Sequence, residues 1–379
     1  MNILDLKEKI IETRRYLHQI PESAFEEYKT SEFIKKELTE MGYQVEQVAK
    51  TGVMAFRKGT GSQRPICFRA DMDALFIEEK TGVDFASKNG FMHACGHDGH
   101  MTMLLGFARY LSSLKEIKRS VLLLFQPGEE NAGGGEVVLN DAAFKKYDVE
   151  YIFGTHLQPD LKEGIIGTKP GAFMAQTIEF NVSIEGISSH GAQPHNGIDA
   201  IYVASQLISS YQSIISRNIN PLESAVITIG KINGGTMRNL IADRVTLEGT
   251  LRTFNMDVYN HVIDRINEVN EGLEKMYGVK IKADFIDFCP PVVNDPYLYK
   301  KFAEGMKPGE FVEMDPLTIS EDFGFYQTKI PGLFLMLGTR NEKLGYVNPL
   351  HSSNFNFDES VLLKGIQTYI GILEKFDAI

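Results

Sequence analysis

The chain lacks tryptophan and has little cysteine, with three cysteines among 379 residues. Cys67, Cys95 and Cys289 are odd in number and far apart, which does not fit the disulfide framework of a small secreted domain. No apolar run reaches the roughly 20 residues needed to cross a bilayer. The opening stretch, MNILDLKEKIIETRRYLHQIPE, has neither the apolar core nor the cleavage site of a signal peptide, so we expect a cytoplasmic protein.

Basic residues are also fewer than acidic ones. There are 39 Lys and Arg against 50 Asp and Glu, a net charge of -11, which disfavours binding to nucleic acid or to an anionic membrane surface. The hydrophobic share of 43% and the charged share of 23% are ordinary for a globular protein. Because the length exceeds one typical domain, we expect two domains and a small-molecule partner.

Helix and strand patterns alternate in the first part of the chain. Apolar spacing predicts a helix in the opening stretch, a second over SEFIKKELTEMG and a third at 101–114. Strands are predicted at 53–56, 65–68, 121–125 and 151–153. Such alternation is typical of an α/β domain in which helices cover a sheet.

The middle of the chain follows a different order, strand, helix, strand, strand, helix, strand. These elements are expected at 176–184, 198–216, 225–232, 245–254, 256–276 and 279–288. The order βαββαβ is that of the ferredoxin-like fold, a self-sufficient unit. We therefore predict an inserted domain at 176–290 and a discontinuous first domain made of 1–175 and 291–379. The second part of that domain is expected to hold a helix at 297–306, a strand at 333–337 and a helix at 359–376.

Candidate metal ligands are densest in the segment HACGHDGH. Its eight residues include His93, Cys95, His97, Asp98 and His100. Thiolate, imidazole and carboxylate groups all bind metals, and a turn with glycine lets the backbone wrap around an ion. The alternative is a polar turn that caps the helix predicted to begin near residue 101.

Carboxylates follow two of the predicted strands directly. Asp71 and Asp73 come after the second strand, and Glu129 and Glu130 come after the third. The ends of strands are where α/β sheets place their sites. One glutamate could bind a metal while the other acts as general base and then general acid, and Asp73 could orient a metal-bound histidine. Taken alone, each acidic pair could equally belong to a turn, a helix cap or a solvated loop.

Histidines occur near two further strand ends and in one loop. His156 follows the strand predicted at 151–153, and His351 lies beyond the strand predicted at 333–337. His190, in the loop SSHGAQPH of the middle domain, could be an ordinary polar residue or a mobile donor to an oxyanion. His18 and His261 have no such context, so we expect them to be surface or packing histidines.

Taken together, these segments resemble the two-metal aminoacylase, carboxypeptidase and deacetylase family. The most similar branch contains hippurate hydrolases, auxin-conjugate hydrolases and N-acetyldiaminopimelate deacetylases. The resemblance covers essentially the whole chain and rests on RRYLHQIPE, RADMDAL, MHACGHDGHM, FQPGEE, GTHL, SSHGAQPH, LEGTLRTF, SEDFGFY and LHSSNF, in that order. It implies an α/β fold with a discontinuous metallopeptidase-like catalytic domain, whose helices flank a mixed sheet, and an inserted ferredoxin-like domain that serves as lid and dimerisation domain.

The resemblance also implies a role for individual residues. The implied metal ligands are Cys95, His97, Glu130, His156 and His351. Glu129 is implied as the catalytic acid/base, and His190 as an oxyanion donor that reaches the active site of a partner subunit. Asn239 and Arg252 resemble lid residues that bind polar groups of the substrate. Two divalent ions per subunit are implied; sulfur among the ligands favours zinc, and manganese, cobalt and nickel also suit this branch.

The predicted activity is hydrolysis of the amide bond of N-acyl, above all N-acetyl, amino acids by a metal-activated water. Alternatives with the same mechanism are an N-acetyldiaminopimelate deacetylase of lysine biosynthesis and a dipeptidase or carboxypeptidase. A hydrolase that uses Cys95 as a nucleophile is a different possibility, which chelation would distinguish. A non-enzymatic metal-binding protein is a further alternative, and the presence of Glu129 argues against it.

Overall fold

The computed structural model describes residues 2–379, which form two units. The first unit comprises the residues up to Gly171 together with Val293–Asp315 and Asp322–Ile379. The second comprises Ala172–Val292 and Pro316–Glu321. Each unit buries a hydrophobic core of its own. Within residues 2–379, no helix combines the length and the apolar character that crossing a membrane requires.

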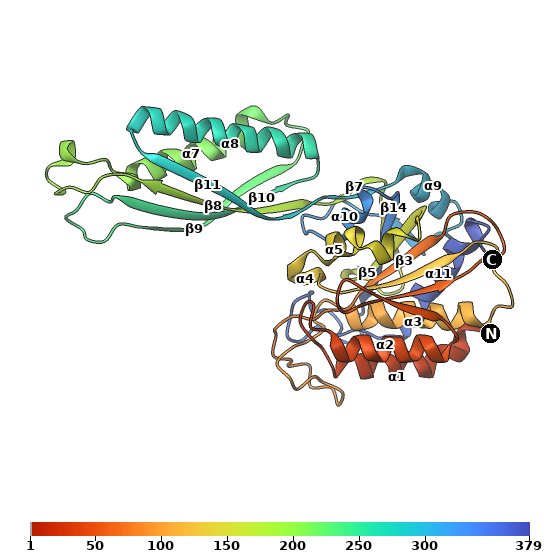
Figure 1. Ribbon diagram of the computed structural model, residues 1–379. Coiled ribbons are helices and arrows are strands. Elements are labelled where there is room, and N and C mark those ends of the chain that lie inside the picture. Colours follow the sequence, from red (N-terminus) through yellow and green to blue (C-terminus); the bar gives the residue numbers. More distant parts are fainter. Residues whose placement is uncertain (1) are drawn as a thin grey trace. The chain divides into compact units, whose positions relative to one another are not determined.

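The first unit is built on an eight-stranded mixed sheet (Figure 1). Its strands, in sheet order, are β1 (Gln44–Val48), β2 (Gly52–Arg57), β4 (Val121–Gln126), β3 (Ile66–Asp71), β5 (Tyr151–Lys162), β14 (Gly332–Arg340), β6 (Ile166–Thr168) and β13 (Phe311–Glu313). Strands β4, β3, β5 and β14 run parallel to one another. The side chains of β3 and β4 are buried throughout, which explains the nearly continuous apolar sequence of β4, whereas β3 ends with the buried charges of Arg69 and Asp71. Residues that follow parallel strands emerge at one edge of the sheet, where they can share a site.

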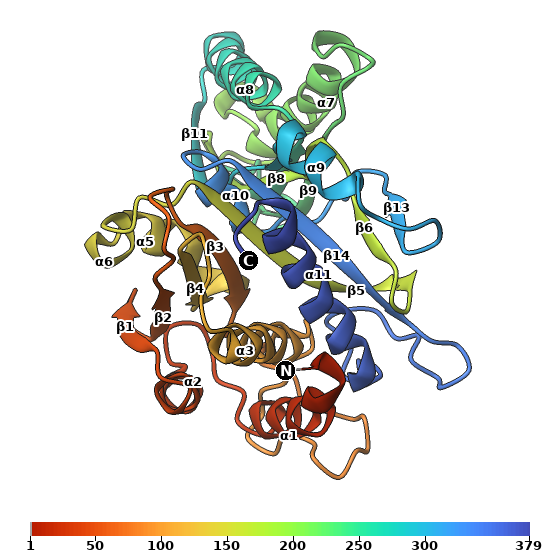
Figure 2. The same cartoon turned by 90° about the vertical axis from the view of Figure 1, so that its right-hand side faces the viewer.

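Helices surround this sheet. They are η1 (Ile3–Leu6), α1 (Lys7–His18), α2 (Tyr28–Glu40), α3 (His97–Ser113), α4 (Glu129–Ala132), α5 (Gly134–Asn140), α6 (Ala142–Lys145), α9 (Pro296–Ala303), α10 (Phe323–Gln327), η3 (Glu359–Val361) and α11 (Leu362–Lys375). Figure 2 shows α3 and α11 beside each other, and both contact Phe68 of β3 through aromatic rings. The absence of a side chain at Gly106 allows the two helices to approach closely. A Cβ atom there would lie 2.4 Å from Ile366 Cδ1. Helix α3 therefore packs against both α11 and the sheet.

The second unit has the ferredoxin-like arrangement. Its main elements are β8 (Gln176–Glu185), α7 (Ala200–Asn218), β9 (Ala225–Gly234), β10 (Arg244–Thr253), α8 (Met256–Tyr277) and β11 (Lys280–Cys289), and the shorter ones are β7 (Gly171–Met174) and η2 (Pro194–Asn196). The short strand β12 (Val292–Asn294) begins in this unit, and its last two residues belong to the first unit. The strand order is β11-β8-β10-β9, with every neighbour antiparallel. Alternate residues of β8 are buried, and side chains of Asp199 and Asn255 cap the first turns of the two long helices.

The predicted fold class is confirmed, with two local differences. The third helix begins at His97 rather than near residue 101, because Gly96 adopts a φ of 91° and turns the chain straight into the helix. Strand β5 continues to Lys162, so His156 lies within a strand and not after its end. Pro159 stops neither the strand nor its pairing because the register with β14 shifts between Gly338 and Arg340.

Candidate metal centre

Cys95 lies at the middle of a cluster of metal-binding side chains. Its Sγ atom is 3.4 Å from His156 Nε2 and 3.3 Å from His351 Nε2. Two sets of three residues have ligand atoms within 4.8 Å of one another and share this cysteine: Cys95, His97, His156 and Cys95, Glu130, His351. The cluster therefore has the donor types and the spacing that two metal ions would need, with Cys95 a member of both sets.

The cluster draws its members from four parts of the first unit. His97 opens α3, Glu130 lies in the first turn of α4, and His156 projects from β5. His351 belongs to the loop after β14 and has a φ of 63°, a left-handed conformation that costs a residue other than glycine about 1 kcal/mol or more. Its backbone N–H donates to Ala94 O at 2.9 Å, which holds this loop next to Cys95.

The hydrogen bonds of two histidines define which nitrogen faces the cluster. His97 Nδ1 lies 2.9 Å from Asp73 O, and His156 Nδ1 lies 2.7 Å from Leu157 O. A carbonyl oxygen can only accept, so each Nδ1 carries the proton. The Nε2 atoms are the ones turned toward Cys95 and Glu130, as metal ligands require.

Two polar atoms of the cluster are buried without a hydrogen-bond partner. They are His97 Nε2 and Glu130 Oε1, which lie 3.8 Å apart. Leaving a buried polar atom unpaired costs about 1–3 kcal/mol, so such atoms normally have a partner. Divalent ions bound at the cluster would give these atoms the missing partners, and the chemistry of these residues therefore fits a metal centre.

The electrostatics of the cluster also favour cations. Burial, together with Glu130, Glu129 and Asp71, raises the pKa of the Cys95 thiol well above its usual range. Burial and nearby carboxylates raise the pKa of Glu130 to about 7, against the effect of His97. Burial lowers the pKa of His97, but Asp71, Asp73 and Glu130 raise it more, to about 10. This excess of negative charge is the reverse of the environment that activates a nucleophilic thiolate.

Asp73 contacts the two glutamates through its carboxylate. Oδ1 accepts the backbone N–H of Glu129 and Oδ2 accepts that of Glu130, each at 3.0 Å. We had expected this carboxylate to orient a histidine, but its nearest oxygen is 3.6 Å from His97 Nδ1, whereas the Asp73 carbonyl is at 2.9 Å. The backbone of Asp73 thus contacts the histidine, and the side chain contacts the glutamate turn.

A further buried network lies behind the cluster, and it includes Asp71 and His100, which the sequence suggested only as members of candidate segments. Arg69 Nη1 donates to Asp71 Oδ2 at 2.8 Å, and Asp71 Oδ1 lies 2.6 Å from His100 Nδ1. His100 Nε2 accepts the backbone N–H of Leu157 at 2.9 Å. The only signal for His100 was its place in HACGHDGH, three residues after His97 on the same helix.

Of the two roles expected for His18, surface or packing, the structure supports packing in the interior, where its ring contacts Phe85. His18 is buried, and its ring lies 2.8 Å from Asp98 Oδ2 and 3.1 Å from Glu79 Oε1. Burial and Arg14 lower its pKa, but Asp98 and Glu79 raise it more, so the net shift is upward. Local spacing cannot reveal such contacts, because Asp98 lies 80 residues further along the chain.

The remaining predicted site residues belong to the second unit. His190 and Asn239 lie on neighbouring exposed segments, joined by a hydrogen bond from Gly191 N to Asn239 O at 2.8 Å. Ala192 N donates to His190 Nδ1 at 3.1 Å, so a neutral ring carries its proton on Nε2 and can donate. Arg252, on β10, is half-buried, and its Nη1 is 3.3 Å from Ser320 Oγ.

Comparison with known proteins identifies the family. The family model described as Peptidase family M20/M25/M40 matches residues 67–375, most of the chain. The chain belongs to this family. The resemblance seen in the sequence is therefore confirmed, as is the prediction that the chain is a hydrolase.

Several M20 relatives match nearly the whole chain. The N-acetyl-L-cysteine deacetylase of Bacillus subtilis (strain 168) is 42% identical over 369 residues, which cover 96% of this chain and 87% of that protein. The N-acetyldiaminopimelate deacetylase of Lactococcus lactis subsp. cremoris (strain SK11) is 38% identical, with 93% of this chain and 94% of that protein covered. A Bacillus subtilis crystal structure described as a dinuclear metal binding peptidase from the M20 family has a TM-score of 0.83 and 34% identity, covering 98% of this chain and 99% of that chain.

Proposed function

We propose that this chain is a dinuclear metal-dependent amidohydrolase that removes the acetyl group of N-acetyl amino acids. The observation that carries the proposal is the cluster around Cys95, with the unpartnered buried atoms His97 Nε2 and Glu130 Oε1. Relatives that match nearly the whole chain are named deacetylases of N-acetyl-L-cysteine and N-acetyldiaminopimelate, and a similar structure is described as dinuclear.

The proposed ligands divide into two sets that share one thiolate. Cys95 belongs to both sets, His97 and His156 complete one, and Glu130 and His351 complete the other. When bound, the ions supply Lewis acidity, which acidifies a water molecule and polarises the carbonyl of the scissile amide. Imidazole and thiolate ligands suit zinc, and manganese, cobalt and nickel are the other candidates.

Glu129 is the proposed acid/base. Its carboxylate takes a proton from the attacking water, whose oxygen bonds to the amide carbon, and then gives that proton to the amine nitrogen as the carbon–nitrogen bond breaks. The products are acetate and the free amino acid. The backbone N–H of Glu129 donates to Asp73 Oδ1, which supports a fixed position for the side chain.

The second unit is proposed to contribute the groups that contact the substrate. His190 Nε2–H would donate to the oxyanion formed as the water attacks, in its own subunit or in the partner of a homodimer formed through this unit. Arg252 would pair with the substrate carboxylate, and Asn239 would hydrogen-bond its polar groups. The net charge of -11 supports a small-molecule partner rather than nucleic acid or a membrane, and we propose a cytoplasmic location.

A hydrolysis screen with defined metals tests the proposal. The enzyme is stripped with chelator, reloaded in turn with zinc, manganese, cobalt and nickel, and assayed for kcat/KM. The substrates are N-acetyl-L-cysteine, N-acetyldiaminopimelate, other N-acetyl and N-benzoyl amino acids, and dipeptides. Preference for N-acetyl amino acids is expected. Faster cleavage of dipeptides would make the chain a dipeptidase instead, and activity that survives chelation would point to thiol chemistry.

A further inference from the structure

Three consecutive backbone amides at the catalytic turn are each held by a buried carboxylate. Those of Glu129 and Glu130 donate to the two oxygens of Asp73, and that of Gly128 donates to Glu27 Oε1 at 3.0 Å. Glu27 and Asp73 both have fully buried side chains. The turn that carries the proposed acid/base and one proposed metal ligand is therefore held from two sides.

Within residues 2–379, no hydrogen bond or ion pair joins Glu27 to the proposed ligands, and both of its carboxylate oxygens accept hydrogen bonds. Oε1 accepts the Gly128 N–H, and Oε2 accepts the hydroxyl of Thr51 at 2.5 Å. Burial, and after it the nearby Asp73, raises the pKa of Glu27 to about 7, against the effect of the Thr51 hydrogen bond. Burying this carboxyl group away from water costs free energy unless its hydrogen bonds to Gly128 and Thr51 are maintained.

The segment that carries Glu27 encloses the turn. The carbonyl of Glu22 accepts the backbone N–H of Ala74, the residue after Asp73, at 2.8 Å. Phe25 adopts a left-handed φ of 58° and covers Gly128 so closely that a Cβ atom there would lie 2.9 Å from its ring. Gly128 itself has a φ of 70°. One segment thus contacts both the Asp73 loop and the glutamate turn.

We infer that Glu27 is a positioning residue for the hydrolysis, which holds the Gly128 amide so that the Glu129 carboxylate stays aimed at the attacking water. The inference rests on the proposed role of Glu129. Without Glu27, the Gly128 N–H would be buried with no acceptor, which costs free energy. The turn would reduce this cost by rotating the peptide bond before Gly128 until its N–H finds another acceptor. A displacement of about 1 Å in a catalytic group can lower the rate about 100-fold.

Two variants at Glu27 separate positioning from simple filling of space. Glu27→Gln keeps an oxygen for the Gly128 N–H and an amide that can donate to Thr51. Glu27→Ala removes the acceptor. We expect Glu27→Ala to lower kcat about 100-fold with little change in KM, and Glu27→Gln to restore kcat to within about tenfold of the wild type. Both are expected to keep the metal content of the wild type.

A second measurement does not depend on turnover. Hydrogen exchange of peptides that contain residues 128–130, measured on the metal-loaded protein, reports how tightly these amides are held. We expect faster exchange in Glu27→Ala and wild-type exchange in Glu27→Gln. Absence of hydrolysis by the wild type would overturn the proposed function, whereas the exchange data would still decide whether Glu27 holds the turn.

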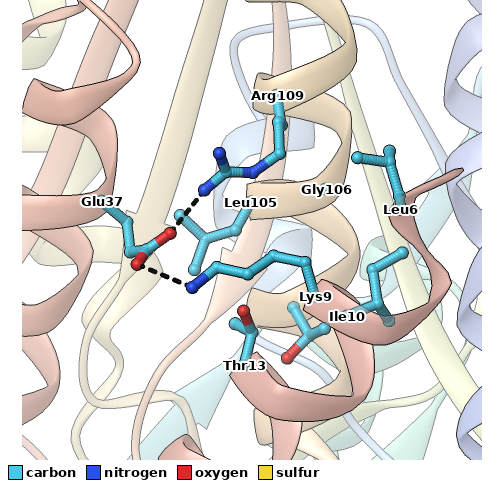
Figure 3. Close-up of a pocket in the computed structure, with 9 residues that line it drawn as sticks. Leu6, Lys9, Ile10, Thr13, Glu37, Leu105, Gly106 and Arg109 are labelled. Carbon is cyan, nitrogen blue, oxygen red and sulfur yellow. Dashed lines mark hydrogen bonds and ion pairs between the residues drawn. The ribbon is translucent and has the colours of Figure 1, made fainter. Parts of the chain in front are cut away.

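Glu37 provides a matched control. It is a buried glutamate of the same unit, 6% exposed, and Figure 3 shows its carboxylate between Lys9 and Arg109, at 3.3 Å and 2.6 Å. Arg109 is twelve residues beyond His97 on α3, or about 18 Å along the helix. Glu37→Ala should lower the thermal stability and leave kcat unchanged.

The outcomes are distinct. Loss of kcat and of exchange protection in Glu27→Ala, with recovery of both in Glu27→Gln and neither change in Glu37→Ala, supports the inference. Wild-type exchange and kcat in Glu27→Ala would overturn it. Equal loss in Glu27→Gln and Glu27→Ala would also overturn it, since the hydrogen bond to Gly128 would then not be what matters.

Discussion

His100 Nε2 accepts the backbone N–H of Leu157 at 2.9 Å, and this bond determines the state of the whole ring. A backbone N–H can only donate, so the proton of the neutral His100 ring lies on Nδ1. From there it is donated in a hydrogen bond to Asp71. On the other side of Leu157, the carbonyl accepts from His156 Nδ1 at 2.7 Å. Two imidazoles therefore hold one residue of β5, and only His156 faces Cys95.

This relationship predicts different effects for two substitutions at His100. Glutamine can keep an acceptor for Leu157, and asparagine can keep a donor for Asp71. We expect His100→Asn to lose about 10- to 100-fold in metal affinity and His100→Gln to lose less, because the orientation of His156 depends on Leu157. Metal content by mass spectrometry and titration with cobalt would measure this. The reverse order would show that the bond to Asp71 matters more.

Substitutions of Glu129 and Glu130 are expected to affect different properties, turnover in one case and metal content in the other. Glu129→Gln should lower kcat by roughly 10²- to 10⁴-fold and keep both ions, because only the proton acceptor is lost. Glu130→Gln should lose bound metal. Activity and metal content of the same preparations test both statements. Loss of metal in Glu129→Gln with retention in Glu130→Gln would mean that the two roles are exchanged.

Removal of metal should abolish activity and lower stability together. Cys95, His97 and His156 are buried, and carboxylates surround the thiol of Cys95, so the folded state gains from bound cations. An ion present at 100 times its dissociation constant adds about 2.7 kcal/mol to the free energy of unfolding. Activity and the unfolding midpoint should both recover when divalent ions are restored. Full activity after chelation would contradict a metal-dependent mechanism.

The sequence revealed what depends on local pattern and missed what depends on distant contacts. The βαββαβ order was readable because β8 alternates buried and exposed residues and the long helices carry their own caps. The extent of β5 was not readable, because its apolar run ends at Phe153 and the mostly polar residues that follow gave no sign that the strand continues to Lys162. The burial of His18 and the contact of Glu27 with Gly128 had no local signal, because their partners lie 80 and 101 residues away.

The pKa of Glu27 predicts a stability difference that grows with pH. The folded state holds this carboxyl at a pKa of about 7, above the unfolded value of about 4.3. The folded state thus binds the proton more tightly than the unfolded state. The resulting contribution to the free energy of unfolding is complete below pH 4 and is lost as the pH rises through 7. This difference in pKa corresponds to about 4 kcal/mol in the free energy of unfolding. Glu27→Gln, which does not titrate, should gain stability relative to the wild type between pH 5 and pH 8.

Urea midpoints of both proteins across that range would measure the trend. A stability difference between Glu27→Gln and the wild type that does not change with pH would show that Glu27 keeps an ordinary pKa when folded.

His190→Ala should slow turnover without affecting the metal centre. The ring can donate from Nε2 because Nδ1 accepts from Ala192. Loss of one oxyanion donor typically lowers kcat by about 10²- to 10³-fold. Steady-state kinetics, metal content and sedimentation of the variant would test this. If kcat is unchanged while the assembly state is preserved, His190 has no part in the reaction.

The position of β14 has a consequence for synthesis on the ribosome. This strand, Gly332–Arg340, lies between β5 and β6, although the whole second unit is made before it. A growing chain therefore exposes an unfinished edge of β5 while more than 150 residues are added, and His351 arrives only after that edge is filled. Unpaired strand edges invite aggregation. This edge of β5 must therefore stay covered until β14 has been made, and the metal centre can be completed only when His351 has followed.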